Sequence, residues 1–402
     1  YVMGADASER AATPDEVARM RVLVREAIDA GAIGLATSQS PNHVGAGGRP
    51  VPSRLAEFDE LRALASTLAD AGTGMVQISA GGEIRFDDYA ELARATRRNI
   101  QWTSLLTRKS HPTLHRELLA RSNALQAEGL AVYPQMSCRE LTMEFDFMEP
   151  FPMERLAMFE PVSAGNAEGK RKFYGDEDFR RALRLEMSAD GSDAGPVVRL
   201  RAAWDDTSIA LCPGRPELED RRLDEVASER GTDAVDVALD LTLEFGREVR
   251  FCIPLANNIE EGVAELLNDP NTTIGLSDAG AHTSQLCDAC FATHLLGHWV
   301  REEGVLSIEE AVRKLSFMQA SLYGINDRGL LRPGMAADVV VFDPATIAAD
   351  EPDETYDLPG GLMRLRQTAQ GVDFTIVNGE VLIEAGEPTG AMPGKIMRGN
   401  AY

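Results

Sequence analysis

The sequence predicts an α/β protein whose main unit is built on parallel strands and which ends in a small β module. An amphipathic helix followed by a short apolar run recurs through much of the chain, and such runs are typical of strands buried on both faces. No G-x-G-x-x-G follows the first apolar run, and no Walker loop is present. A doubly wound sheet and a (β/α)8 barrel both fit the repeat, and the missing nucleotide motifs favour the barrel.

The first helix is expected to begin at Thr13, which has capping-box spacing to Glu16 and is followed by Pro14, and to end at residues 30–31. The apolar run AIGLATS follows it. Five more units are ELRALASTLADAG before MVQIS, YAELARATRRN before IQWTSLL, HRELLARSNALQAEG before LAVYPQMS, AVDVALDLTLEFG before VRFCIP, and EGVAELLNDPN before TIGLSD. About six parallel strands are therefore expected, fewer than a closed barrel of eight.

Two segments depart from the repeat. Residues from about 148 to 220 are expected to form an insertion, either a lid or substrate wall or a plain surface excursion. Residues 329–402 contain short β segments with turns at Pro333-Gly334 and Asn378-Gly379, and Asn-Gly is a strong hairpin signal. We therefore predict a barrel unit over 1–328 and a small β-sandwich module over 329–402.

Composition excludes several classes of protein. The 402 residues are 44% hydrophobic and 26% charged, and no apolar run approaches the roughly 20 residues of a membrane helix. A formal charge of −24 repels phosphate backbones, so neither nucleic acid nor membrane is an expected partner. Five cysteines fit a reducing compartment, so the expected location is cytoplasmic. The chain opens YVMGADASER, without initiator Met or signal peptide, and we expect an upstream segment to be absent.

Long, ordered motifs in the second half carry a family resemblance. They are IGLSDAGAH, RGLLRPGMAADVVVFDP and IVNGEVLIEAGEPTGAMPGKIMRG, with a weaker match through DAGAIGLATSQ. Together they resemble the amidohydrolase superfamily, in its D-aminoacylase (N-acyl-D-amino-acid deacylase) branch. The resemblance implies a barrel enzyme that hydrolyses an amide C–N bond of a small-molecule substrate with one or two Zn²⁺ ions.

The stretch TTIGLSDAGAH ends an apolar strand with a carboxylate, Asp278. The resemblance implies that Asp278 takes the proton of a metal-activated water and passes it to the leaving amine, and that it is itself a candidate metal ligand. In the barrel, the carboxyl ends of the strands form the active end, where Asp278 would lie. The alternative is a carboxylate that caps the next turn.

The sequence also departs from the family. Nothing matches the His-x-His that ends the family's first barrel strand, so the barrel is expected to be incomplete at its N-terminus and the other metal ligands to lie in the absent part. Ser79 and Ser104 lie near positions where relatives carry further metal histidines, and serine is a poor zinc ligand. One metal ion, weak binding, and no metal at all remain open.

Four further residues are candidates for substrate contact. Tyr133 lies in AVYPQMS, which resembles the family's Tyr-Pro-Tyr strand end, and Arg139 nearby is a candidate anion partner. His282 follows Asp278 in the same loop, and His43 lies in the loop after the first strand. Both histidines have the alternative of a plain surface position.

The remaining histidines and a pair of cysteines are interpreted structurally. His294 and His298 are spaced i, i+4, but no Glu follows His294 and the neighbours are apolar, so packing is the better interpretation. The same holds for Cys287 and Cys290, a lone C-x-x-C pair. His111 and His115, which open a helix, are expected at the surface.

Three functions follow from these observations. The first is a D-aminoacylase-like hydrolase. The second is a cyclic amidohydrolase of the dihydropyrimidinase kind, which needs a carboxylated barrel lysine, and Lys109 lies beyond its strand. The third is a catalytically silent family member that acts as a binding or assembly subunit. Homo-oligomerisation stays open in each case.

Overall fold

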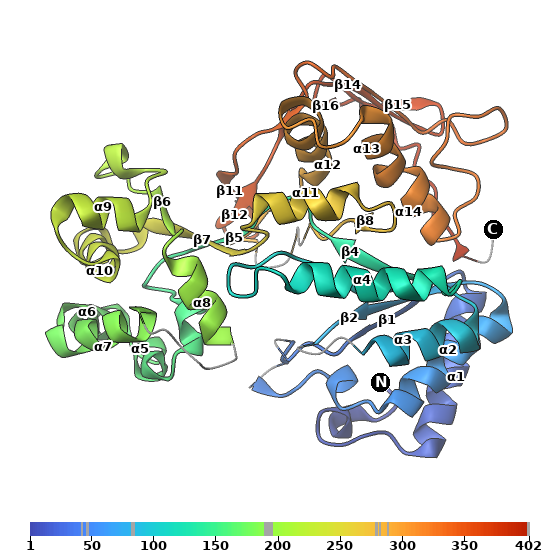
Figure 1. Cartoon of the computed structure of the whole chain (residues 1–402), viewed down its shortest axis with the longest axis horizontal. Coiled ribbons are helices and arrows are strands. Elements are labelled where there is room, and N and C mark those ends of the chain that lie inside the picture. The colour runs from blue at the N-terminus through green and yellow to red at the C-terminus, as the bar shows by residue number, and fades with distance from the viewer. Residues whose placement is uncertain are drawn as a thin grey trace.

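The computed structural model describes residues 1–399 apart from 42, 46–47, 82–84, 189–195, 278–279, 281–282 and 288, and it describes the side chains of neither 155 nor 196–199. Three regions are distinguished in Figure 1: a parallel sheet with its helices at lower right, an antiparallel unit at left, and a β-rich C-terminal region above. In the described part of the chain, no helix combines the length and apolarity needed to cross a membrane.

The parallel sheet has five strands in the order β1-β2-β3-β4-β8. Their bounds are β1 Gly34–Ser38, β2 Met75–Ser79, β3 Ile100–Thr103, β4 Val132–Met136 and β8 Thr273–Ile274. Neighbouring strands pair in parallel throughout. Five of the six predicted apolar runs therefore form parallel strands, as expected.

Helices cover one face of this sheet. They are α1 Pro14–Asp29, α2 Phe58–Ala71, α3 Phe86–Thr96, α4 Leu114–Ala127 and α11 Glu260–Asn268. The predicted capping box is present, since the Thr13 side chain accepts from the Glu16 amide and the Glu16 carboxylate accepts from the Thr13 amide. Trp102 is fully buried on this face, where it meets Phe86 of α3 edge-to-face and Ser122 of α4. Each such buried apolar side chain contributes about 1.5–3 kcal/mol to stability.

The sixth predicted parallel strand is a correction. The run VRFCIP forms β7 (Arg250–Ala256), which lies between β5 (Leu141–Phe145) and β6 (Ser208–Leu211) in an antiparallel sheet. The preceding helices, α9 (Leu223–Arg230) and α10 (Ala234–Phe245), belong to the same unit. The pattern of a helix followed by an apolar strand is a local property of the sequence. It does not specify which other strand the apolar run pairs with.

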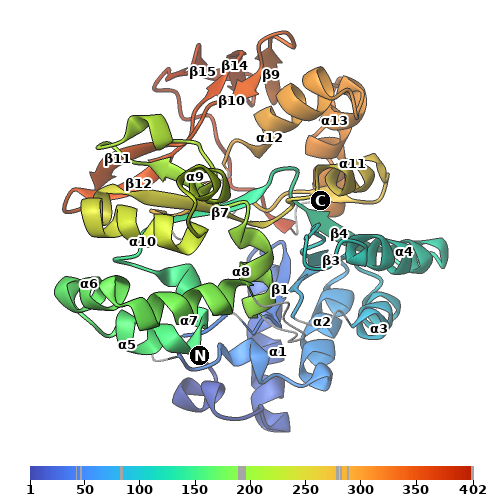
Figure 2. The same ribbon diagram turned by 60° about the vertical axis from the view of Figure 1, so that its left-hand side comes forward.

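The antiparallel sheet has its own hydrophobic core, formed by residues between Met143 and Ile253. The remaining helices of this unit are α5 Glu160–Ser163, α6 Ala167–Gly175, α7 Glu177–Ser188 and α8 Pro196–Trp204. Phe147 is fully buried at its centre, with edge-on contacts to Tyr174, Trp204 and Phe251 at centroid distances of 5.6, 6.5 and 5.7 Å. Figure 2 shows the helices of this unit grouped on the side away from α3 and α4.

The C-terminal region begins with helices. α12 (Phe291–His294) continues into a π-helix over Leu295–Glu302, followed by α13 (Ile308–Leu315) and α14 (Phe317–Leu322). The strands are β9 Val339–Phe342, β10 Ala348–Ala349, β11 Asp353–Leu358, β12 Leu362–Arg366, β13 Ala369–Gln370, β14 Val372–Val377, β15 Glu380–Glu384 and β16 Glu387–Pro388. One sheet has the order β16-β15-β14-β9, and β10-β13 and β11-β12 form separate pairs.

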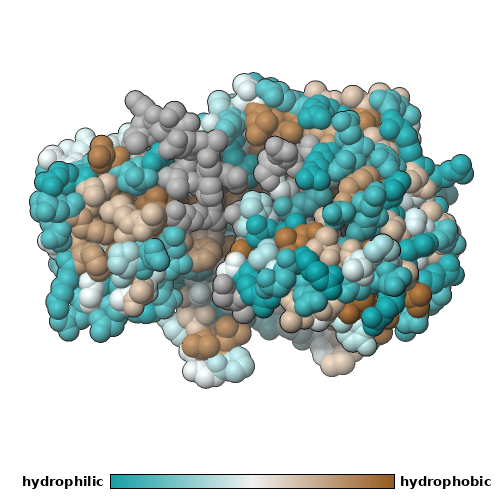
Figure 3. All heavy atoms as spheres, turned by 90° about the horizontal axis from the view of Figure 1, so that it is seen from below, coloured by the Kyte–Doolittle hydropathy of each residue, from teal (hydrophilic) through white to brown (hydrophobic). Residues whose placement is uncertain are grey.

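The predicted Asn-Gly hairpin is confirmed between β14 and β15. Asn378 and Gly379 both have positive φ, 50° and 84°, which is the backbone that a two-residue hairpin turn of this kind requires. On the face seen from below, hydrophilic side chains predominate and apolar ones are scattered (Figure 3), in keeping with the large excess of acidic residues.

Candidate active site at the carboxyl edge of the parallel sheet

One row of paired residues near the carboxyl ends of the five parallel strands is polar. Strand register places side by side Ser38, Ser79, Thr103, Gln135 and Thr273. The row lies on the sheet face opposite Val76, Ile78 and Trp102, which are buried beneath the helices. Thr273 is fully buried, and its hydroxyl donates to the Pro134 carbonyl at 2.8 Å. The other four side chains are half-buried and uncharged, so they suit hydrogen bonding to a substrate or water.

Gln77 and Gln101, two residues before the row on β2 and β3, form a hydrogen-bonded layer with Gln135 of the row. Gln77 Nε2 donates to Gln101 Oε1 at 3.3 Å and to Gln135 Oε1 at 3.5 Å. Gln101 is fully buried and donates to Thr273 Oγ1 at 3.0 Å. Because buried polar groups in a satisfied network hold one another in place, this layer gives the polar row a fixed floor.

Asp278 and His282 lie outside the described residues. The strand before them is well anchored: the Gly275 amide donates to the Met136 carbonyl at 3.0 Å, and Gln319 Nε2 donates to the Ile274 carbonyl at 3.0 Å. A Cβ on Gly275 would lie 2.4 Å from Gln135 Nε2, so a larger residue would displace the Gln135 side chain. After Ile274 the chain therefore leaves the sheet at its carboxyl edge, next to β4.

His43 lies at the same edge. Its Nδ1 is 2.5 Å from Ser38 Oγ, at the end of β1, and its carbonyl accepts from Arg54 at 3.2 Å. The side chain is exposed. The structure thus brings His43 to one end of the polar row, and its role in catalysis stays a prediction.

Tyr133 and Arg139 lie in different surroundings. Tyr133 is half-buried and pairs in register with Gln101, so it shares the face of the glutamine layer. Arg139 follows β4, and its Nη1 donates to Gln367 Oε1 at 2.7 Å, in the C-terminal region. Arg139 therefore helps to join the barrel strands to that region, and its contact with a substrate anion stays a prediction.

The described residues do not fit a zinc site. Ser79 lies in the polar row and Ser104 directly follows β3, and hydroxyls are poor zinc ligands. Within the described ranges, no group of three His, Cys, Asp or Glu side chains is arranged to hold a metal ion. Cys287 and Cys290 are both free thiols, and Cys290 Sγ contacts the carbonyls of Gln367 and Thr368, which supports the packing interpretation.

The sequence did not single out Asn257, which ties together the loops at this edge. It is 4% exposed, and its Nδ2 donates to the carbonyls of Ser137 at 2.8 Å and Arg139 at 2.9 Å. Its Oδ1 accepts from the Thr107 amide at 3.1 Å. Its φ of 58° is left-handed, a conformation that Asn tolerates better than most residues. The only sequence signal was an Asn pair directly after an apolar run.

A charged cluster borders the same loops. Lys109 pairs with Asp206, which Arg222 also approaches at 3.5 Å. Glu140 is exposed as a whole residue, but its carboxyl group is largely shielded from water. This desolvation, together with repulsion from Asp206, raises the pKa of Glu140 to about 7. The positive charge of Lys109 acts in the opposite direction. The ion pair of Lys109 gives no support to a carboxylated lysine.

The histidines on helices show one correct prediction and one error. His294 and His298 lie on a packed helix, as expected, and Leu295, Leu296 and Trp299 are buried beside them. His115, expected at the surface, is 1% exposed. It packs against α11, where a Cβ on Gly262 would lie 3.0 Å from its Nε2, a contact between segments far apart in the sequence.

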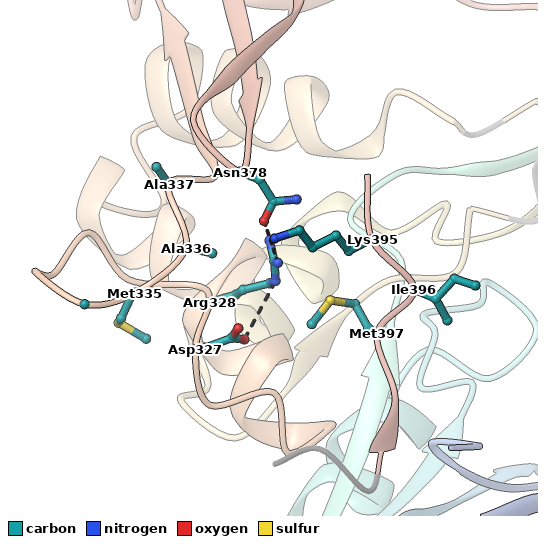
Figure 4. A pocket seen from close by; sticks show the side chains of 10 residues that line it. Asp327, Arg328, Met335, Ala336, Ala337, Asn378, Lys395, Ile396 and Met397 are labelled. Carbon is teal, nitrogen blue, oxygen red and sulfur yellow. Dashed lines mark hydrogen bonds and ion pairs between the residues drawn. The ribbon is translucent and has the colours of Figure 1, made fainter. Parts of the chain in front are cut away.

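Two of the motifs that carried the resemblance, RGLLRPGMAADVVVFDP and IVNGEVLIEAGEPTGAMPGKIMRG, meet in the C-terminal region, away from this edge. Arg328 donates to Asn378 Oδ1 at 2.8 Å and pairs with Asp338, which also accepts from the Asn378 amide at 2.8 Å. These residues join the RPG-containing run to the VNG turn. Beside them is a pocket of about 430 Å³, also lined by Asp327 and Lys395 (Figure 4). These contacts give the two motifs a structural role.

The fold, the polar edge and these motifs define a member of the amidohydrolase family. The family's model matches residues 1–383, and the chain belongs to that family. Its relatives lie in the D-aminoacylase-like branch. A D-aminoacylase of Alcaligenes xylosoxydans xylosoxydans is 33% identical over 193 residues, which are 48% of this chain and 36% of the relative. An N-acyl-D-aspartate deacylase of the same organism is 34% identical over 196 residues, 48% of this chain and 35% of the relative.

An uncharacterized protein of Mycobacterium tuberculosis is 27% identical over 93% of this chain and 64% of its own length, so the chain spans less than two thirds of the curated relatives it matches. Among solved structures, N-acyl-D-glutamate deacylase from Bordetella bronchiseptica, complexed with zinc and a phosphonate inhibitor, has a TM-score of 0.58 at 22% identity, covering 97% of this chain and 68% of that one. D-aminoacylase has a TM-score of 0.55 at 23% identity, covering 97% and 67%. The predicted fold class, a TIM-like barrel with a β-rich C-terminal part, is confirmed.

Proposed function

We propose that this chain is part of a hydrolase that cleaves the amide C–N bond of an N-acyl amino acid or a related small molecule. The observation that carries the proposal is the polar row at the carboxyl edge of the parallel sheet, directly beside the strand that leads to Asp278. Deacylases of N-acyl-D-amino acids among the relatives support this substrate class.

Asp278 is the proposed proton carrier. An amide is a poor electrophile and an amine a poor leaving group, so hydrolysis needs a water that loses its proton and a group that delivers that proton to the departing nitrogen. A carboxylate at the active end of a barrel can do both in turn. In this proposal His43, His282, Tyr133 and Arg139 line the substrate site, and the hydroxyls of the polar row orient the acyl group.

Zn²⁺ is the proposed cofactor, one or two ions, because relatives of known structure include a D-aminoacylase with a binuclear metal center and a zinc-bound deacylase. Asp278 is the one proposed ligand within this sequence, and the remaining ligands would come from outside the described residues. A bound zinc ion supplies Lewis-acid activation of water or carbonyl.

We also propose that residues 1–328 form the barrel unit, with an inserted unit around residues 148–220, and that residues 329–402 form the β module. The core of the antiparallel unit reaches from Met143 to Ile253, so β5 and β7 would belong to the inserted unit as well. Placed beside the carboxyl edge, this unit is suited to form a wall of the substrate site.

The experiment compares wild-type protein with Asp278→Asn on a panel of N-acyl-D-amino acids, with and without added Zn²⁺. The substitution is nearly isosteric, so turnover is expected to fall by a factor of about 10² to 10⁴ while the circular dichroism spectrum stays the same. Asp59→Asn, whose side chain is 79% exposed on α2, is the control. Unchanged turnover in Asp278→Asn would refute the assignment.

A second candidate function is a binding or assembly subunit without catalysis. It is favoured by the absence of a three-ligand metal group among the described residues. A folded, metal-free protein that hydrolyses none of the panel, even with added Zn²⁺, would support this second candidate.

A further inference from the structure

The segment that follows Asp278 and His282 is held by three consecutive carbonyl groups. Those of Thr283, Ser284 and Gln285 accept hydrogen bonds at 2.7, 2.5 and 2.7 Å. The donors are the Leu365 amide of β12, the Arg250 guanidinium of β7 and the Glu144 amide of β5. The segment is therefore fixed between the antiparallel sheet and the β11–β12 hairpin, which lie next to each other in both Figure 1 and Figure 2.

Arg250 is the only side chain among these three donors, and it joins three separate pieces of the chain. Besides the Ser284 carbonyl, its guanidinium lies 3.0 Å from a Glu144 oxygen on β5 and 3.1 Å from a Glu354 oxygen on β11. The Arg250 side chain is only 10% exposed, and those of Glu144 and Glu354 are 19% and 29% exposed. The contacts to Ser284 and Glu354 are charge-assisted hydrogen bonds, which are stronger and more directional than surface ion pairs. The contact to Glu144 is an ion pair without hydrogen-bond geometry, and burial raises the pKa of Glu144 while Arg250 opposes that shift.

The 283–285 segment has a pocket on one side, so the contacts of Arg250 can affect how mobile the segment is. A pocket of about 760 Å³ opens beside Arg250, between the antiparallel sheet and the hairpin, and Thr283, Ser284 and Gln285 also line it. On that side the segment borders open space instead of packed side chains. Its position therefore depends on the three hydrogen bonds named above, of which the one from Arg250 is the only one with a charged donor.

We propose that Arg250 is a positioning residue for the candidate active site, which holds the 283–285 segment and the β11–β12 hairpin against the antiparallel sheet. The inference rests on the proposed function, because Asp278 and His282 directly precede this segment in the sequence. The strand before Asp278 is already fixed through Gly275 and Ile274, and Arg250 fixes the chain after it.

The planar guanidinium is essential to this role. Its three nitrogens reach a carbonyl and two carboxylates in different directions, whereas an ammonium group carries all its donors on one nitrogen and cannot span the same three acceptors. Arg250→Lys should therefore keep the charge but lose part of the positioning. Arg250→Met keeps most of the aliphatic stem and removes every polar contact.

A matched control is available three residues earlier. Arg247 lines the same pocket, but it is 63% exposed and pairs only at the surface with Glu149, also 63% exposed. Arg247→Met removes the same charge from the same pocket without touching the 283–285 segment. Glu354→Gln is a milder second variant, which weakens the hairpin side of the network if Arg250→Met fails to fold.

Hydrogen–deuterium exchange on the whole protein gives the first readout. In Arg250→Met, peptides covering 283–287 and β11–β12 should exchange at least about tenfold faster than in wild type, with those of β1–β4 unchanged. Arg250→Lys should give an intermediate increase, Glu354→Gln an increase confined to the hairpin, and Arg247→Met none. Unchanged exchange over 283–287 in Arg250→Met, or an equal increase throughout the molecule, overturns the proposal.

Steady-state kinetics give the second readout. For a substrate that wild type hydrolyses, kcat in Arg250→Met should fall about tenfold or more with KM changed by less than about threefold, and Arg250→Lys should recover part of the loss. An unchanged kcat despite faster exchange overturns the positioning role. If wild type hydrolyses nothing, the proposed function fails by itself, and the exchange measurement still decides whether Arg250 holds the segment.

Discussion

The imidazole rings of His294, at the end of α12, and His298, in the π-helix that continues it, are stacked. Their centroids are 5.0 Å apart and their planes are 25° from parallel. His298 is held from outside by Glu260, 2.6 Å from its Nε2, and Glu302, 3.4 Å from its Nδ1. His294 is the more enclosed ring: burial, and then the positive charge of Arg139, lowers the pKa of His294 to about 3. The fold therefore accommodates His294 in its neutral form.

This arrangement predicts a loss of stability in acid. Since the pKa of His294 is about 3 in the fold and 6.5 for an unperturbed histidine, the unfolded chain binds the proton first as the pH falls. The stabilisation from neutral His294 is present above pH 6.5, and is lost toward pH 3 at up to about 1.4 kcal/mol per pH unit.

Urea unfolding between about pH 7 and pH 5 tests this prediction. His294→Phe keeps an aromatic ring but cannot take up a proton, so its free energy of unfolding should fall less steeply with pH than that of wild type. His111→Gln, at an exposed position, is the control and should follow the wild-type curve. Parallel curves for His294→Phe and wild type would contradict the assigned pKa.

Asn257→Ala should destabilise the protein by about 3 kcal/mol or more. The change removes the Asn257 partner of the Thr107 amide and of the Ser137 carbonyl in a buried place. It also removes one of two donors to the Arg139 carbonyl, which Ser137 Oγ still reaches at 3.2 Å, and it puts a Cβ-bearing residue without a polar side chain at a φ of 58°. Asn257→Gly removes the same hydrogen bonds without the strain, so the Gly and Ala variants should differ by about 1 kcal/mol.

The neighbouring Asn258→Ala provides the comparison. Asn258 is half-buried and contributes one contact to the Lys109 amide at 3.2 Å and one to the Pro254 carbonyl at 3.5 Å. Its replacement should cost about 1 kcal/mol or less. Chemical denaturation of the three variants checks the order, and equal effects of Asn257→Ala and Asn258→Ala would argue against the role given to Asn257.

Gly34→Ala should strongly destabilise the parallel sheet. A Cβ on Gly34 would lie 2.2 Å from the Met75 carbonyl oxygen and 3.0 Å from the Met75 amide nitrogen, so β1 and β2 would have to move apart. We expect a loss of about 2–4 kcal/mol, as for other overpacked positions in a core.

Gly175→Ala, in α6, is the matched substitution. No atom lies within 4 Å of the position its Cβ would occupy, so its effect should stay within about 0.5–1 kcal/mol of zero. Thermal unfolding of both variants makes the comparison. A Gly34→Ala protein as stable as wild type would show that β1 and β2 do not approach as closely as described.

The sequence predicted the parallel strands well because their signal is local. Runs such as MVQIS and IQWTSLL follow amphipathic helices, and burial on both faces leaves few alternatives for them. The same reasoning misplaced VRFCIP, because the partner of an apolar strand is decided by distant segments. Here the partner is β5, whose alternating run LTMEF was not recognised as a strand.

Less of the candidate site could be predicted from the sequence. The polar row follows from strand register, which relates residues as distant as Ser38 and Thr273 and leaves no mark on any local pattern. Asn257 acts through contacts to two loops more than a hundred residues away. Asp278 came from a family resemblance, and its role remains a prediction.

The strand pairing at the boundary of the antiparallel unit bears on how this unit can change in evolution. Leu141, at the start of β5, pairs directly with Ala256, at the end of β7. The chain thus leaves the parallel strands and returns to them at neighbouring positions. A short turn could join Leu141 directly to Ala256. A unit joined in this way can be acquired, trimmed or exchanged during evolution while the parallel strands keep their order.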